Sequence, residues 1–189
     1  MFVHLTTHSS FSLQEGLLNP SELVQAAQAQ GMPALGLTDH RLLTGSVEFV
    51  HACQKSGIQP ILGLEIDLET GKLALLATST EGWSNLCRLS SALALQDDPE
   101  APFTLEALAP YNKDLIALSD TQNDGTGERL AQIKDIFSDR LYLTLQDPSI
   151  GMPLFSLSRQ MKIPMVVTQP VYYLTPDQAN LQRTLTAIR

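Results

Sequence analysis

The fold class is indicated most directly by Gly31-Met-Pro-Ala-Leu-Gly-Leu-Thr-Asp-His40. This stretch contains a helix-ending glycine, a proline, a short apolar run, and finally polar residues that can bind metal. The same order of features returns at residues 57–65 and at residues 162–169. The apolar runs are continuous rather than alternating, as in parallel strands that are covered on both faces. The chain is therefore predicted to repeat a βα unit, with polar residues at the carboxyl ends of its strands.

Seven segments have the composition of strands. They are Phe2–Leu5, Ala34–Thr38, Ile61–Leu68, Leu73–Ala77, Asp114–Ser119, Arg140–Leu145 and Met165–Thr168. Seven parallel strands alternating with helices favour a closed or nearly closed βα barrel, and a doubly wound open sheet is the alternative. The chain has no GxGxxG motif after its first strand and no P-loop, so the usual signatures of a nucleotide-binding sheet are missing.

Capping residues mark four of the intervening helices. These helices are predicted to begin at Asn19-Pro20-Ser21-Glu22, around Ser46, at Thr80-Glu81 and at Thr175-Pro176-Asp177-Gln178. Gly31 and Gly57 end the first two. The last helix is still running at Arg189 without a C-cap signal, so we expect the natural protein to continue past that residue.

Length and composition limit which classes of protein this chain can belong to. At 189 residues and 43% hydrophobic content, the chain can bury one substantial core, and a single domain over residues 1–189 is predicted. No apolar stretch approaches the about 18 residues that span a bilayer, and no signal-peptide pattern is present, so a cytoplasmic protein without membrane contact is expected. Cys53 and Cys87 are predicted to be free, buried thiols. The net charge of −8 opposes binding to DNA by this chain alone.

Metal-capable residues follow the first predicted strands. His8 lies just beyond the first strand, Asp39 and His40 end the second, and Glu65 lies in the third. In a barrel these positions would converge on one mouth. Histidine nitrogens and carboxylate oxygens suit zinc, manganese or iron, and a cluster of such ions could activate water against a phosphate ester. The alternative is that the histidines are hydrogen-bonded structural residues.

The order of several short blocks resembles one known family. Residues 2–16, Phe-Val-His-Leu-Thr-Thr-His-Ser-Ser-Phe-Ser-Leu-Gln-Glu-Gly, resemble the opening of the PHP domain at the N-terminus of the bacterial DNA polymerase III α subunit. Later blocks that resemble the same domain are 37–40, 45–49, 57–65, 75–86, 116–119, 142–146, and 173–177 together with 185–189. The resemblance extends over nearly the whole chain and depends on the order and spacing of the blocks together.

The resemblance implies a PHP-type α/β fold, a distorted seven-stranded (β/α)7 barrel. It also implies a metal-dependent phosphoesterase site, which some polymerases use as a 3′–5′ exonuclease and others retain only as structure. Of nine implied ligand positions, His8, His40 and Glu65 keep the ligand type, and Glu15 stands in for an aspartate. Asp39 is expected to support the ligands without touching an ion. The five remaining positions hold Thr6, Lys72, Thr121, Pro170 and Tyr172.

Lys72 suggests a specific hypothesis about this altered site. Its ammonium group could lie beside Glu15, Glu65 or Asp39 and replace part of the charge that metal ions would supply, because an unpaired buried carboxylate is costly. The alternative is that Lys72 simply points to solvent.

Three functions are compared. The first is the PHP domain of a replicative polymerase, catalytically silent, packed against the polymerase body of the same chain and against a proofreading exonuclease subunit, with DNA bound only by the full polymerase. The second is an active phosphoesterase or 3′–5′ exonuclease that holds one zinc or manganese ion through His8, His40, Glu65 and Glu15. The third is a stand-alone α/β binding protein. The first is favoured, and no cofactor is expected for it.

Overall fold

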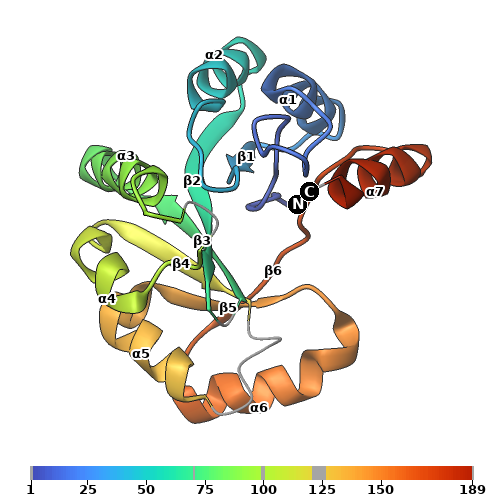
Figure 1. Ribbon diagram of the computed structural model, residues 1–189. Coiled ribbons are helices and arrows are strands. Elements are labelled where there is room, and N and C mark those ends of the chain that lie inside the picture. The colour runs from blue at the N-terminus through green and yellow to red at the C-terminus, as the bar shows by residue number, and fades with distance from the viewer. Residues whose placement is uncertain (1, 70, 99–100, 121–126, 189) are drawn as a thin grey trace. The chain divides into compact units, whose positions relative to one another are not determined.

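The structure is a computed structural model that describes residues 2–69, 71–98, 101–120 and 127–188 (Figure 1). The chain divides into two compact units. Unit 1 comprises Met1–Leu64 and Gln169–Arg189, and unit 2 comprises Glu65–Thr168. Within the described ranges, no helix has both the length and the apolar character needed to cross a membrane.

The described residues form an α/β fold with six strands. The strands are β1 Ala34–Leu37, β2 Gln59–Leu68, β3 Gly71–Ala77, β4 Leu115–Ser119, β5 Leu141–Leu145 and β6 Met165–Val167, hydrogen-bonded in that order. The α-helices are α1 Pro20–Ala29, α2 Ser46–Ser56, α3 Thr80–Ala94, α4 Leu105–Leu108, α5 Glu128–Phe137, α6 Gly151–Met161 and α7 Ala179–Ala187. Four 3₁₀ turns, η1 Ala109–Tyr111, η2 Ser138–Arg140, η3 Pro148–Ile150 and η4 Pro176–Gln178, complete the described elements.

The prediction that all strands run parallel was wrong for β3. The pairs β1–β2, β4–β5 and β5–β6 are parallel, but β3 pairs antiparallel with β4, with Leu75 opposite Ala117. β2 ends at Leu68 and β3 begins at Gly71. That interval is far too short for the crossover that a parallel pair needs, so β3 reverses the direction of the chain. Apolar composition alone does not distinguish the two directions when a strand is buried on both faces.

The predicted first strand, Phe2–Leu5, is not a strand in the structure, because its pairing is irregular. The Gly36 amide of β1 donates to the His4 carbonyl at 2.8 Å, but the Thr38 amide donates to the Thr7 carbonyl at 2.9 Å. An advance of two residues along β1, from Gly36 to Thr38, is thus matched by an advance of three residues along the segment, from His4 to Thr7. One extra residue on one of two paired segments is the geometry of a bulge. The Thr7 hydroxyl donates to the Gly36 carbonyl, an acceptor that a backbone amide would otherwise serve.

Residues 4–8 are nevertheless held on both sides within unit 1. Thr7 forms an isolated parallel bridge with Val171. The Val171 amide donates to the Thr6 carbonyl at 3.1 Å, and the His8 amide donates to the Val171 carbonyl at 2.9 Å. The segment thus lies between β1 and Val171, at the place expected for the first strand. It forms too few backbone hydrogen bonds with either neighbour to be a strand.

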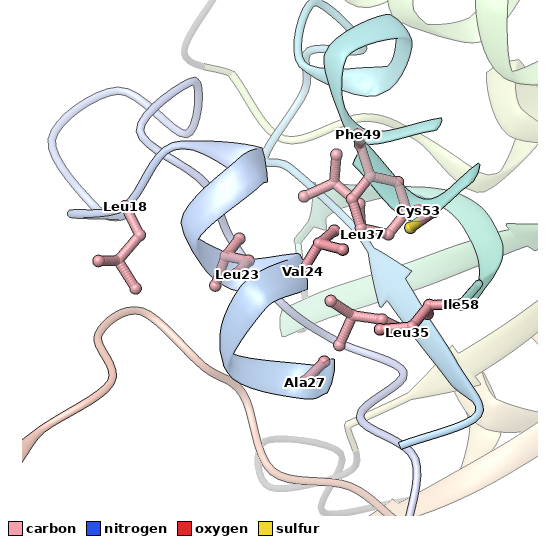
Figure 2. Packing of buried hydrophobic residues seen from close by; sticks show 9 residues of the cluster. All are labelled: Leu18, Leu23, Val24, Ala27, Leu35, Leu37, Phe49, Cys53 and Ile58. Atoms are coloured by element: carbon pink, nitrogen blue, oxygen red, sulfur yellow. The ribbon is translucent and has the colours of Figure 1, made fainter. Parts of the chain in front are cut away.

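The core of unit 1 lies where α1 and α2 meet β1. Figure 2 shows the nine buried residues of this cluster, which are Leu18, Leu23, Val24, Ala27, Leu35, Leu37, Phe49, Cys53 and Ile58. Two predicted caps are confirmed: Asn19 and Glu22 form a complete capping box at the start of α1, and Gly57 ends α2 in the left-handed conformation at φ +68°. The start of α2 near Ser46 has no side-chain cap. Sequence-local capping therefore sets where both helices begin or end.

The core of unit 2 includes the buried face of α3. Leu86, Leu89 and Leu93 are fully buried on this helix, at the i, i+3, i+7 spacing of one helical face. Cys87 lies off that face and is exposed, so the prediction of a buried thiol was wrong for Cys87, whereas it is confirmed for Cys53. Helices α5 and α6 were not predicted, because neither begins with a side-chain cap.

Gly36 is required where β1 meets the irregular segment. A Cβ atom at this position would lie 2.2 Å from the carbonyl oxygen of Leu5, a backbone atom that cannot move aside as a side chain could. Gly36 thus permits the close approach that places residues 4–8 against β1.

We predict that Gly36→Ala lowers the free energy of unfolding by about 2 kcal/mol or more, the usual cost of overpacking against backbone. Gly151→Ala is the matched control, because a Cβ atom there meets nothing within 4 Å. Since it only replaces a glycine at the start of α6, we expect it to be neutral or slightly stabilising. Urea unfolding of both variants measures the difference, and equal stabilities would contradict the assignment.

Candidate functional site

The candidate site in unit 1 is built on a coiled loop that precedes α1. The Ser12 amide donates to the Ser9 carbonyl, and the amides of Glu15 and Gly16 both donate to the Ser12 carbonyl, at 2.9 to 3.1 Å. Gly16 allows this coiling, because a Cβ atom there would lie 2.1 Å from the Ser9 carbonyl oxygen. The loop therefore returns on itself, which directs its serine hydroxyls to the end of β1.

Asp39 is the anchor of this loop. Its carboxylate is 2% exposed and accepts three hydrogen bonds: from the Ser9 amide at 2.6 Å, the Ser9 hydroxyl at 2.7 Å and the Ser12 hydroxyl at 2.9 Å. Burial raises the pKa of Asp39 above its ordinary value, although the hydrogen bonds from Ser9 and Ser12 and the charge of nearby His8 act in the opposite direction. Ionised Asp39 therefore costs folding free energy, which these bonds offset only in part.

Ser12 connects Asp39 to both candidate histidines. Its single hydroxyl proton is donated to Asp39, so its oxygen accepts the hydrogen bond from the His40 amide at 3.0 Å. The same oxygen lies 3.3 Å from Nδ1 of His8. By elimination Nδ1 is the donor in this contact. Asp39 is thus linked to His8 through Ser12, and its role in supporting metal ligands stays a prediction.

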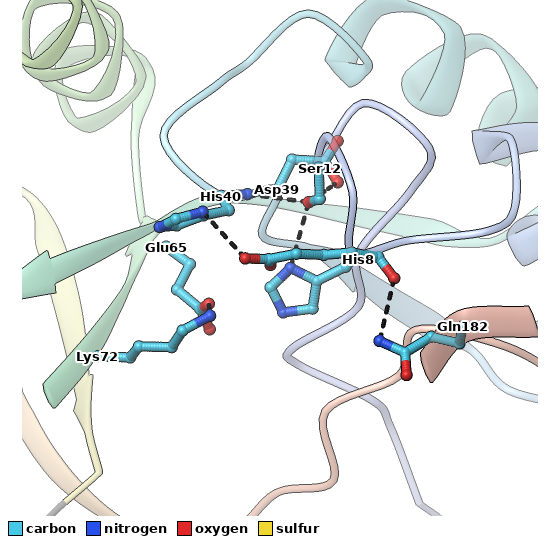
Figure 3. Close-up of polar contacts among 8 residues, drawn as sticks. His8, Ser12, Asp39, His40, Glu65, Lys72 and Gln182 are labelled. Carbon is cyan, nitrogen blue, oxygen red and sulfur yellow. Dashed lines mark hydrogen bonds and ion pairs between the residues drawn. The ribbon is translucent and has the colours of Figure 1, made fainter. Parts of the chain in front are cut away.

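Glu15 and His40 form a buried pair. The Glu15 Oε1 atom lies 3.2 Å from Nδ1 of His40, and both side chains are at most 7% exposed (Figure 3). The Glu15 carbonyl accepts a long hydrogen bond of 3.4 Å from the Gln182 side chain of α7. The nearest ligand-type atoms of His8 and Glu15 lie within 4.8 Å of each other. Unit 1 therefore brings together His8, Glu15, Asp39 and His40, and their assignment to a metal site stays a prediction.

Tyr172 contacts the same cluster. Its ring stacks on His8, with centroids 4.5 Å apart and planes 17° from parallel. The Leu17 amide donates to the Tyr172 carbonyl at 3.0 Å, which holds the backbone of this residue beside the loop. Thr6 is also buried nearby in sequence, and its hydroxyl has no hydrogen-bond partner among the described residues. Pro170 is half-buried, and it offers no side-chain donor.

In unit 2, Glu65 and Lys72 form an ion pair on neighbouring strands. The Lys72 Nζ atom lies 2.6 Å from Oε1 of Glu65, whose side chain is 7% exposed, whereas that of Lys72 is 38% exposed. The interpretation that Lys72 points to solvent without a partner is therefore wrong. Lys72 neutralises one of the carboxylates that the sequence offered as its partner. Thr121, the remaining position of the implied ligand set, lies outside the described residues.

Sequence reasoning missed Ser9 and Ser12. Serines are common in loops, so nothing in the local pattern distinguishes these two from Ser10, which is exposed. Their partner Asp39 lies 27 to 30 residues away, and only the folded chain shows the pairing.

Comparisons with known proteins agree on one family. The profile of the PHP domain matches residues 4–148. The error-prone DNA polymerase of Symbiobacterium thermophilum is 35% identical over the whole chain, and the DNA polymerase III subunits alpha of Aquifex aeolicus and Bacillus subtilis are 30% and 31% identical over the whole chain. The chain covers 21%, 20% and 19% of these relatives, so it spans roughly a fifth of their length.

Solved structures are similar in fold. A two-domain protein from Bacteroides vulgatus, described as containing a predicted PHP-like metal-dependent phosphoesterase, aligns with 96% of this chain and 55% of its own at a TM-score of 0.66 and 17% identity. A putative metal-dependent phosphoesterase from Bifidobacterium adolescentis aligns with 97% of this chain and 96% of its own at a TM-score of 0.59 and 12% identity. At these identities the similarity shows the fold alone.

We predict that Ser12→Ala lowers the free energy of unfolding by about 2 kcal/mol, because it removes the buried hydroxyl that bonds to Asp39, His8 and the His40 amide. Ser10→Ala is the matched control in the same loop, and its exposed side chain should change stability by less than about 0.5 kcal/mol. Chemical unfolding of the two variants measures this. An equal effect would show that the hydroxyl network adds nothing.

We predict that Lys72→Met destabilises unit 2 by about 1 to 3 kcal/mol, because it leaves the buried Glu65 carboxylate without its cation. The partial exposure of Lys72 keeps the figure below that of a fully buried pair. In a Glu65→Gln background, Lys72→Met should cost clearly less, since no charge remains to be paired.

The control for this cycle is Glu69, whose side chain is 63% exposed in its pair with Arg129. Glu69→Gln should change stability by less than about 0.5 kcal/mol. Additive effects of Lys72→Met and Glu65→Gln would mean that the ion pair does not stabilise the protein.

Proposed function

Because the chain belongs to the PHP domain family, we propose that it is the PHP domain of a bacterial DNA polymerase III α subunit and serves there as a catalytically silent scaffold. The observation that carries this proposal is that the polar residues of the candidate site are matched to one another within the chain. Asp39 accepts hydrogen bonds from Ser9 and Ser12, and Glu15 pairs with His40. In unit 2, Lys72 pairs with Glu65.

The donor atoms do not suit a centre of several metal ions. Thr6 offers only a neutral hydroxyl, and Pro170 offers nothing. The Lys72 ammonium would repel a divalent ion near Glu65. Tyr172 stacks flat on His8 and would have to present its phenol oxygen instead to act as a ligand. The two-metal clamp that favours phosphodiester cleavage therefore has too few ligands among the described residues.

The scaffold proposal includes the setting of the domain. We place it in a longer polymerase chain that continues past Arg189, packed against the polymerase body and against a proofreading exonuclease subunit, in the bacterial cytoplasm. DNA would be held by the full polymerase, since a net charge of −8 disfavours contact with phosphates by this part alone. We also retain the distorted seven-stranded barrel as a proposal, with residues 4–8 as its irregular strand.

A second function is a phosphoesterase with one zinc or manganese ion, proposed to be held by His8, Glu15, His40 and Glu65. One observation favours it: the ligand-type atoms of His8 and Glu15 lie within 4.8 Å of each other. A bound ion would supply Lewis acidity and a water of lowered pKa. Against it, Glu15 already pairs with His40 and Glu65 with Lys72, so binding an ion would first require these pairs to separate.

We predict that protein purified without added ions contains far less than one zinc or manganese per chain by plasma mass spectrometry. It should also release no nitrophenol from bis(p-nitrophenyl) phosphate when manganese is added. The reason is that Glu15 and Glu65 already pair with His40 and Lys72.

The phosphoesterase would be favoured instead by a stoichiometric ion that is lost in His8→Ala. His51→Ala is the matched control, because His51 is an exposed histidine of α2 outside the site. An ion that is retained in His51→Ala and lost in His8→Ala would reject the silent scaffold.

A further inference from the structure

Helix α7 carries an apolar stripe that its own unit does not cover. None of the described residues of this helix is buried. Leu181 lies within the helix and is 60% exposed, and Ile188 directly follows the helix and is 70% exposed. Leu185, between them, is half-buried. Their spacing of i, i+4 and i+7 places all three on one side of a helix. We call Leu181, Leu185 and Ile188 the α7 stripe.

The helix is nevertheless held in place. η4 precedes it with a complete capping box between Thr175 and Gln178. The Gln182 side chain donates to the Glu15 carbonyl, which attaches α7 to the loop of the candidate site. Tyr173 and Leu174, directly before η4, line a cavity of about 220 Å³ together with residues of α1. The stripe is therefore a preformed surface on a capped helix rather than part of an unstructured tail.

The scarcity of charged residues in α7 favours a protein as its partner. Arg183 is the one charged residue of Ala179–Ala187, in a chain with 17% charged residues. Depletion of charge around exposed apolar residues is typical of the centre of a protein interface. A helix that lies on a membrane would instead carry several lysines or arginines on its polar face, where α7 has asparagine, glutamine and threonine.

The size of the stripe favours a partner in the same chain. A helix of nine residues is about 13 Å long, and a surface of this size falls short of the about 1,000 Å² that a stable interface between separate molecules requires. Docking within one chain needs less area, because the partner is present at a high effective concentration. The relatives extend far beyond the part that this chain matches, with roughly four-fifths of their length outside it.

We propose that the α7 stripe is the face on which the remainder of the same polypeptide, the polymerase part, docks. This inference rests on the proposed function, since it requires the longer chain. It assigns a surface to that packing: the apolar side of α7, next to the loop that carries Glu15. The partner is expected to present apolar side chains that cover Leu181 and Ile188.

The test is hydrogen–deuterium exchange of the α7 amides in the 189-residue chain and in the full product of its gene. We expect exchange in α7 to slow by about tenfold or more in the full product, since a covered helix opens less often. In the full product, Leu181→Ser with Ile188→Ser should return exchange to the rate of the short chain. Asn180→Ser with Thr184→Ser, on exposed polar positions of the same helix, should leave the protection intact.

Three outcomes would overturn the proposal. Equal exchange in both proteins would show that nothing covers the stripe. Loss of protection in the polar control as well would show that helix stability, and not the stripe, is responsible. Self-association of the short chain that Leu181→Ser with Ile188→Ser abolishes, measured by sedimentation, would identify a second copy as the occupant. A reading frame that ends at Arg189 would instead reject the proposed function, because no polymerase part would exist. This result differs from the three outcomes above, which reject only the docking of that part on the α7 stripe.

Discussion

The buried carboxylate of Asp39 is the constraint on which the candidate site depends. A carboxyl group with 2% exposure is tolerated only where hydrogen bonds replace water, and Asp39 receives them from Ser9 and Ser12. These bonds fasten the loop before α1 to the end of β1. The positions of His8 and Glu15 follow, because both residues belong to that loop. A single carboxylate thus converts a loop of ordinary composition into a fixed arrangement of polar side chains.

Charge is balanced in the same manner at the other carboxylates. Glu15 faces His40 in unit 1, and Glu65 faces Lys72 in unit 2. In a metal-dependent enzyme, bound ions would supply the positive charge that such carboxylates need. Here Lys72 supplies it to Glu65, and Glu15 contacts a ring nitrogen of His40. These pairs support the proposal that the domain serves as a scaffold, because each of the two carboxylates has a structural contact within the chain.

The accuracy of sequence-based prediction differed between elements for physical reasons. The starts of α1 and η4 were predicted because capping boxes act over three residues, and the end of α2 because Gly57 adopts a left-handed conformation. Strand positions were predicted from apolar runs, but not the reversal at β3, since a doubly buried strand has the same composition in either direction. The predicted first strand failed because a bulge at Thr7 breaks its ladder, and bulges have no reliable local signal.

The sequence by itself determined the α/β class, most of the strands and helix caps, and the side chains available for the site, because these depend on local pattern and residue type. The tertiary structure decided which of those side chains meet. Ser12 joins Asp39 to His8, Tyr172 stacks on His8, and Lys72 meets Glu65. Such pairings are set by how the strands and loops pack, and a single sequence holds no record of distances between residues far apart along the chain.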